Sequence, residues 1–145
     1  MQLSQLKERF TNLNFEEVVG NALEVQREKL IDYQQLQMLE GKKADGEQIG
    51  KYKNTYYANR KFGMNSLAGY GNVDLRLTNE FQRNINVRFF SNALTVFSTD
   101  SKSTDLMDKY GPNIFGLNAD FIIQFGKDFL NEEISKQIKN KVYGL

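Results

Sequence analysis

The residues best suited to molecular recognition lie in one short stretch, residues 51–62, Lys-Tyr-Lys-Asn-Thr-Tyr-Tyr-Ala-Asn-Arg-Lys-Phe. Its cations and tyrosines are Lys51, Lys53, Arg60, Lys61, Tyr52, Tyr56 and Tyr57. Cations that neutralise phosphates and rings that stack on bases are the mixture that single-strand binding proteins use. Tyrosine and arginine are also enriched at the hot spots of protein interfaces. We favour a protein interface, with nucleic-acid binding and a purely structural amphipathic strand as the alternatives.

Patterns typical of enzymes are incomplete in this chain. It has no Cys and no His, so thiolates, the commonest general base and the commonest metal ligand are all missing. Ser4 and Lys7 match a Ser-x-x-Lys pattern without its companion motifs. A calcium loop starting at Asp100 would need a glycine and a bidentate glutamate where Asp105 and Gly111 stand. We therefore expect no catalytic site, no metal and no cofactor.

Residues 98–118 contain signals that start and stop a short helix. Ser103 or Thr104 can cap it, Gly111 can end it in a left-handed conformation, and Pro112 prevents its continuation. Its inward-facing residues are predicted to be Leu106, Met107 and Tyr110. The next apolar residues are Ile114, Phe115 and Leu117. They follow in a segment too irregular for a core strand, which predicts an exposed apolar wedge that docks a partner.

Length and composition indicate one domain spanning residues 1–145, large enough to bury roughly 70% of its unfolded surface. The net charge of +1 does not favour a protein whose main task is to coat nucleic acid. No run of 18 apolar residues occurs, so we expect a soluble protein of the cytoplasm with no membrane partner. Residues 1–40 hold four basic and seven acidic side chains, whereas residues 42–61 hold six basic and two acidic ones. This asymmetry would let copies of the chain attract one another around a ring, although two ordinary solvated faces explain it equally well.

The first half of the chain is predicted to be helical and then irregular. Residues 1–12 read as a short amphipathic helix or arm, because Leu3, Leu6 and Phe10 have helical spacing. Asn14 and Glu17 form a capping signal for a helix of roughly 25 residues that ends near Gly41, with Gly20 as its weak point. Residues 42–71 are predicted to be a flexible, basic, tyrosine-rich loop.

The second half predicts a small sheet followed by a helix. Residues 73–75 read as a short strand, and Thr78 can cap a helical turn. Residues 85–90 and 94–97 alternate as a hairpin with Val87 and Phe89 on one face and a reversal at residues 91–92. Asn118 or Asp120 caps a final helix that reaches about residue 141, weakened by Gly126. The fold class is therefore α+β, a small antiparallel sheet packed against two long helices.

The order of these segments resembles a known family. The segment Val73-Asp74-Leu75-Arg76-Leu77-Thr78-Asn79-Glu80-Phe81, the hairpin ending Ser98-Thr99-Asp100, and the run Tyr110-Gly111 with Ile114-Phe115-Gly116-Leu117-Asn118 carry the resemblance. Over residues 41–142 the chain is similar to the head-to-tail connector, or tail-completion, proteins of bacteriophage necks. Family members commonly have Asp-Leu-x-x-Thr-Gly where this chain ends in Asn79, a residue that tolerates positive φ.

The resemblance implies a structural virion protein and no enzyme. It implies a homo-oligomeric ring in the phage neck, made in the host cytoplasm, that joins the portal or adaptor to the tail and lets DNA pass through its lumen. The partner-binding residues would then be the wedge and the tyrosine-rich segment. The alternative function is a small nucleic-acid-binding protein that uses the same basic segment.

Overall fold

The computed structural model describes residues 1–76, 80–90 and 93–144. Its helices are α1 (Leu3–Thr11), α2 (Phe15–Val25), α3 (Arg27–Leu39), α4 (Thr55–Met64), α5 (Glu80–Arg83), α6 (Ser103–Tyr110), α7 (Ala119–Phe125) and α8 (Asn131–Tyr143). A 3₁₀ turn, η1 (Pro112–Ile114), precedes α7, and a π-helical segment, η2 (Gly126–Leu130), joins α7 to α8. The strands are β1 (Ile85–Phe90) and β2 (Ala93–Ser98), paired antiparallel. This arrangement confirms the predicted α+β class.

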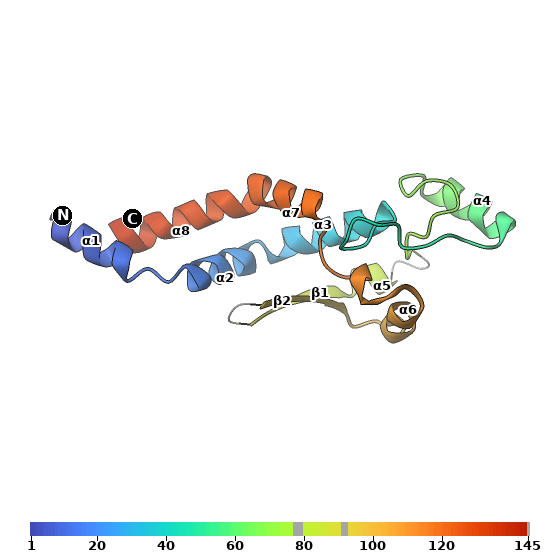
Figure 1. The fold of residues 1–145 in the computed structure, drawn as a ribbon, viewed down its shortest axis with the longest axis horizontal. Helices are drawn as coiled ribbons and strands as arrows, with labels where there is room; N and C mark the ends of the chain where they lie inside the picture. Colours follow the sequence, from blue (N-terminus) through green and yellow to red (C-terminus); the bar gives the residue numbers. More distant parts are fainter. Residues whose placement is uncertain (77–79, 91–92, 145) are drawn as a thin grey trace.

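The molecule is elongated, with both termini at one end and α4 at the other (Figure 1). The helices α2 and α3 run end to end, and the segment from α7 to α8 returns alongside them. The hairpin lies on the opposite side of α2 and α3 from α8 and contacts α3 through β1. The two long helical stretches thus form one layer, which the small sheet covers on one side.

The first long helix begins where the sequence predicts but bends elsewhere. Asn14 Oδ1 accepts a hydrogen bond from the Glu17 amide at 3.2 Å, which confirms the cap. The helix bends at Gln26, with φ −98° and ψ 18°, and not at Gly20, which lies within α2. Directly after the bend, Arg27 donates to the Val87 carbonyl of β1. The bend therefore lies where the helix meets the hairpin, a tertiary contact that the sequence pattern does not reveal.

The hairpin confirms the two predicted strands, with Val87 opposite Val96 and Phe89 opposite Leu94. The predicted reversal at residues 91–92 and the predicted cap at Thr78 lie outside the described residues. The predicted strand at residues 73–75 is wrong, because this stretch is buried irregular chain in which Leu75 has φ 59°. A left-handed residue cannot continue a strand, so the chain turns there.

The C-terminal helix begins at the predicted cap, where Asn118 Oδ1 accepts from the Phe121 amide at 3.0 Å. The π-helical segment begins at Gly126, the predicted weak point. Tyr33 of α3 faces this helix, and its hydroxyl donates to Asp128. The Tyr33 ring lies 5.8–5.9 Å from the ring centroids of Phe121, Phe125 and Phe129. This aromatic cluster holds α3 against α7 and η2.

Two fully buried glutamines of α3 bind the backbone of residues 114–118. Gln34 accepts from the Gly116 amide at 2.8 Å and donates to the Ile114 carbonyl at 3.5 Å. Gln37 donates to the Gly116 carbonyl at 2.8 Å and accepts from the Asn118 amide at 2.7 Å. Both side chains are 0% exposed. Because buried backbone groups need partners, these two amides replace the strand or helix that the segment lacks.

The glutamine pair predicts a large stability effect. Gln37→Leu keeps a similar volume but leaves the part-buried Gly116 carbonyl and the buried Asn118 amide without partners, so we expect a loss of about 2 to 4 kcal/mol of unfolding free energy. Urea unfolding followed by circular dichroism measures it. Gln124→Leu, at an exposed position of α7, is the control and should change stability by less than about 0.5 kcal/mol. Equal effects of the two substitutions would contradict the proposed role of Gln37.

Candidate docking surfaces and a basic tyrosine pocket

The centre of the tyrosine-rich segment is the helix α4, so the prediction of a loop throughout residues 42–71 is wrong. Asn54 caps the helix, since its Oδ1 accepts from the Tyr57 amide at 3.1 Å. Between Tyr56 and Met64 there is no proline and no β-branched residue, so the local sequence permits a helix once it is capped. Arg60 and Lys61 are thereby placed on different faces of α4, whereas Lys51 and Lys53 precede it.

The predicted partner-binding residues of this segment separate in space. Tyr56 and Arg60 are exposed, Tyr56 to 77%. Tyr52 and Tyr57 are half-buried and pack edge to face, with ring centroids 4.9 Å apart. Lys61 is only 5% exposed. Lys61 is therefore part of the interior and not, as predicted, a residue available to a partner.

Lys61 is buried because it pairs with Asp74, whose side chain is the centre of a polar network. The Lys61 Nζ lies 2.8 Å from Asp74 Oδ1. Asn65 Nδ2 donates to Asp74 Oδ2 at 2.9 Å and to the Leu39 carbonyl at 2.8 Å. The Arg76 amide donates to Asp74 Oδ1 at 2.9 Å. The network joins α4, the end of α3 and residues 74–76, and removing one partner of such a buried pair typically costs about 3 to 5 kcal/mol.

Above this network lies a cavity of about 540 Å³, here called the basic tyrosine pocket. It is lined by Lys51, Tyr52, Lys53, Asn54, Tyr57, Val73, Leu75, Leu106, Lys109 and Tyr110. Lys109 and Tyr110 come from α6, far from residues 51–62 in the sequence, so the sequence pattern does not predict that they share a pocket. Leu106 and Tyr110 are four residues apart on α6, which places them on one helix face. Gly50 permits the packing, because a Cβ there would lie 3.1 Å from the Tyr110 ring.

The two central phenols of the pocket stay protonated at neutral pH. Burial, and next the negative charge of Asp74, raise the pKa of Tyr52 well above its usual value. The same two causes raise the pKa of Tyr57, and nearby Arg60 and Lys109 oppose them. Tyr52 directs its hydroxyl at Asp74, with 3.5 Å between the oxygens. The pocket therefore presents neutral aromatic rings beside cationic lysines.

The prediction of an exposed wedge at Ile114, Phe115 and Leu117 is wrong for Ile114. Ile114 is 0% exposed and belongs to the core cluster that contains Met38 and Phe81. Phe115 and Leu117 are half-buried, and the Phe115 ring lies 5.7 Å from that of Phe81. The glutamines of α3 satisfy this backbone in the interior, so the irregular segment does not have to reach solvent.

An apolar depression runs along the hairpin instead, and we call it the hairpin groove. Its two adjoining parts have volumes of about 410 and 500 Å³ and share Leu23 and Leu94. The part between α2 and the hairpin includes exposed Phe15 and Phe90. The other part is lined mainly by Leu30, Val96, Met107, Phe115, Leu117, Ile122, Phe125 and Leu130. Phe115 and Leu117 thus form part of the wall of this groove.

The helix α1 is a second apolar surface that is largely exposed. It has no buried residue, and Leu3 and Phe10 are 81% and 47% exposed. Its contact with the rest of the chain is with α8, where the Phe10 and Tyr143 rings are 6.4 Å apart. Arg9 also donates to the Val142 carbonyl at 2.9 Å. We call α1 the arm, as the sequence analysis predicts a short helix or arm here.

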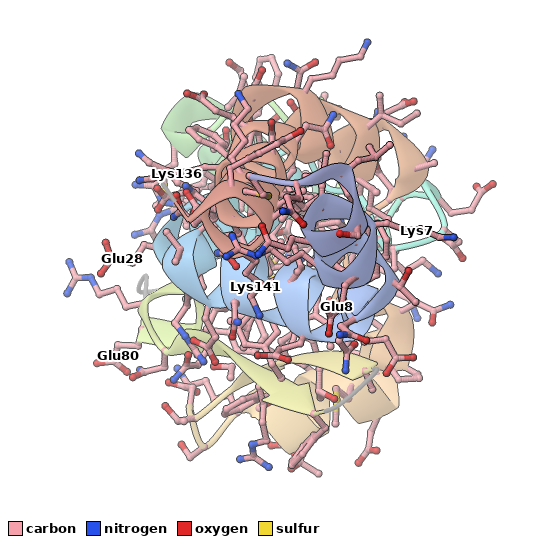
Figure 2. All side chains as sticks on the ribbon, turned by 90° about the vertical axis from the view of Figure 1, so that its left-hand side faces the viewer. Lys7, Glu8, Glu28, Glu80, Lys136 and Lys141 are labelled. Atoms are coloured by element: carbon pink, nitrogen blue, oxygen red, sulfur yellow. The ribbon has the colours of Figure 1, made fainter. Side chains whose placement is uncertain are left out.

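The acidic excess of the N-terminal residues is partly neutralised within the chain. Lys141 of α8 lies 3.1 Å from Glu17 of α2. Figure 2 views this end and shows Lys7 and Glu8 of the arm together with Lys136 and Lys141 of α8, so both signs of charge are interspersed. Charge asymmetry along the sequence is therefore a weaker argument for self-association than the apolar surfaces are.

Burial of Ile114 predicts its mutational effect. Ile114→Ala should lower the free energy of unfolding by about 2 to 5 kcal/mol, because it leaves a cavity in the core. Ile123→Ala changes the same side chain at a site on α7 that is 56% exposed, and should cost less than about 1 kcal/mol. Chemical denaturation compares the two variants. An Ile114→Ala protein as stable as Ile123→Ala would place residue 114 outside the core.

Alkaline pH should destabilise the protein through the half-buried phenol of Tyr52. The pKa of Tyr52 is raised in the folded state, so its stability contribution is complete below the unfolded pKa of about 10 and is lost as pH rises through the folded value. Tyr52→Phe should therefore lose less stability than wild type between pH 9 and 11, measured by denaturant titration at each pH. Tyr56→Phe alters an exposed ring and should follow wild type. Identical profiles for Tyr52→Phe and wild type would refute this linkage.

In the described part of the chain, no group of three or more Asp or Glu side chains is placed to hold a metal ion. None of the helices described has the length and hydrophobicity to cross a bilayer. A scan against protein-family models and searches of curated proteins and of solved structures find no match to this chain. Functional assignment therefore depends on the surfaces of the chain itself.

Proposed function

We propose that this protein is a structural subunit of a bacteriophage neck, which forms a ring with copies of itself between the portal or adaptor and the tail. The observation that carries the proposal is that one chain has both an exposed apolar arm and an apolar groove. The order of sequence segments similar to connector proteins supports the same role. In this proposal the protein is not an enzyme, is made in the host cytoplasm and ends in the virion.

The arm and the groove are both apolar. Leu3, Leu6 and Phe10 are spaced at i, i+3 and i+7, the pattern of helices that lay an apolar stripe into a hydrophobic groove. The nine-residue arm is about 14 Å long. It lies along α8, on the opposite side of α2 from the hairpin (Figure 1). The best-fitting occupant of the groove is therefore the arm of a second copy.

A contact between two different surfaces of identical chains is heterologous, so it repeats from copy to copy. It closes into a ring if the rotation between neighbours divides the full circle and otherwise forms an open filament. A ring would leave other faces of each copy for the portal, adaptor or tail proteins, with DNA passing through the lumen. The binding free energy comes from burial of apolar side chains that are exposed in the single chain.

Two variants test the arm and the groove separately. Leu3→Ser with Leu6→Ser alters the arm, and Phe90→Ser with Leu94→Ser alters the groove. Each double change should weaken self-association by about 30-fold or more, because hot-spot truncations cost about 2 kcal/mol. An equimolar mixture of the two variants should form a dimer and nothing larger, since only one contact per pair is intact. Sedimentation velocity across a concentration series measures this.

The control is Met64→Ser with Leu67→Ser, two exposed apolar residues near the far end of the molecule, which should assemble as wild type does. Equal loss in the control would indicate general stickiness of exposed apolar residues. Larger species in the mixture of arm and groove variants would exclude the arm-to-groove contact. A wild-type chain that stays monomeric at every concentration, alone and with portal and tail proteins, would contradict the ring itself.

A further inference from the structure

The basic tyrosine pocket differs in chemistry from the hairpin groove. Three lysines border it, Lys51, Lys53 and Lys109, and its lining includes no Asp or Glu. In the described part of the chain, no carboxylate forms an ion pair with any of these lysines. The pocket therefore has three positive charges that the chain itself leaves uncompensated.

Among the described residues, Asp74 and Asp105 adjoin lining residues in the sequence but form no ion pair with the pocket lysines. Asp74 lies beneath the floor, 1% exposed, and is paired with Lys61. Asp105 precedes Lys109 by one turn of α6 but forms no ion pair with it. The first turn of α4 adds the partial positive charge of a helix N-terminus at the pocket wall. The local field thus favours an anion.

The interior of the pocket favours an aromatic or apolar group. Val73, Leu75 and Leu106 form apolar lining, and Tyr52, Tyr57 and Tyr110 supply rings. A volume of about 540 Å³ lies within the usual range for small-molecule sites. A ligand that satisfies the whole pocket combines an anion with a planar, largely apolar ring.

We propose that the basic tyrosine pocket binds one nucleotide, with its phosphate at Lys51, Lys53 and Lys109 and its base against the tyrosine rings. Lysine binds phosphate as a point charge, and tyrosine rings accept any base because every base has a π-face. The nucleotide comes either from a single nucleic-acid strand or from a free mononucleotide. The pocket is distinct from the arm and the hairpin groove, so this inference does not depend on ring formation.

The test uses the full chain and a fluorescently labelled ten-residue oligo-dT in anisotropy titrations at several salt concentrations. Lys51→Ala with Lys53→Ala and Lys109→Ala should remove most of the salt dependence. The three lysines contact one phosphate, and neutralising one phosphate of a single strand corresponds to a log–log slope of about −0.7, or about a threefold loss of affinity between 50 and 200 mM salt. Tyr57→Leu should weaken binding about tenfold, whereas Tyr57→Phe should bind as wild type does. Circular dichroism confirms that each variant is folded.

The matched control is Lys7→Ala with Lys136→Ala and Lys139→Ala, which removes the same charge from exposed lysines of α1 and α8. Figure 2 shows Lys7 and Lys136 at the end of the molecule that carries the termini. The control should keep the wild-type salt slope, and an equal loss in both triple variants would overturn the proposal. Competition with dTMP supports a free nucleotide as the source, and competition by unlabelled oligo-dT alone supports a strand. Tighter binding of a poly-glutamate peptide than of the oligonucleotide would overturn the proposal in favour of an acidic protein partner, as would no binding of either nucleotide probe.

Discussion

The fold depends on the hydrogen bonds between two glutamines of α3 and the irregular chain at residues 114–118. This segment connects the hairpin and α6 to the C-terminal helix, and it has no strand or helix partner for its own backbone. Gln34 and Gln37 are one turn apart, so both side chains face the same strip of chain and bind it at four points. Their amides allow Ile114 to enter the core, which places Phe115 and Leu117 in the wall of the hairpin groove. The groove is thus a consequence of polar bonding inside the molecule.

The Lys61–Asp74 pair has the same role at the other end of the molecule. Without a cation, a carboxylate that is 1% exposed would be strongly destabilised. The pair neutralises the interior charge, and Asn65 adds a hydrogen bond from α4 to the end of α3. The full positive charges of the basic tyrosine pocket are therefore those of Lys51, Lys53 and Lys109 at its rim. The four cations of residues 51–62 therefore have different places in the structure. Lys61 is structural, Arg60 is exposed, and Lys51 and Lys53 border the pocket.

Local signals in the sequence predicted the local structure well. Asn14 and Asn118 cap the helices for which they were expected, both strands of the hairpin form, and Gly111 has positive φ. The predicted cap of α6 at Ser103 or Thr104 is wrong, because α6 begins at Ser103 and has no side-chain cap. The larger errors arise where distant contacts decide. The bend at Gln26, the burial of Ile114 and the burial of Lys61 each depend on a partner more than ten residues away. Asn54 is a local signal that the loop prediction for residues 42–71 misses. It caps α4, although the glycines and charges around it are typical of a loop.

The contacts of the arm differ from these interior contacts, because no residue of the arm is fully buried. The contacts of the arm with α8 include one aromatic pair and a part-buried hydrogen bond. Moving such an element costs little of the folding free energy, which resides mainly in buried apolar area and satisfied interior polar groups. In the proposed ring, the arm exchanges its contact with α8 for an apolar contact on another molecule without disturbing the core. The proposal therefore separates the contacts that fold one copy from the contacts that join two, with the boundary at the short connection from α1 to α2.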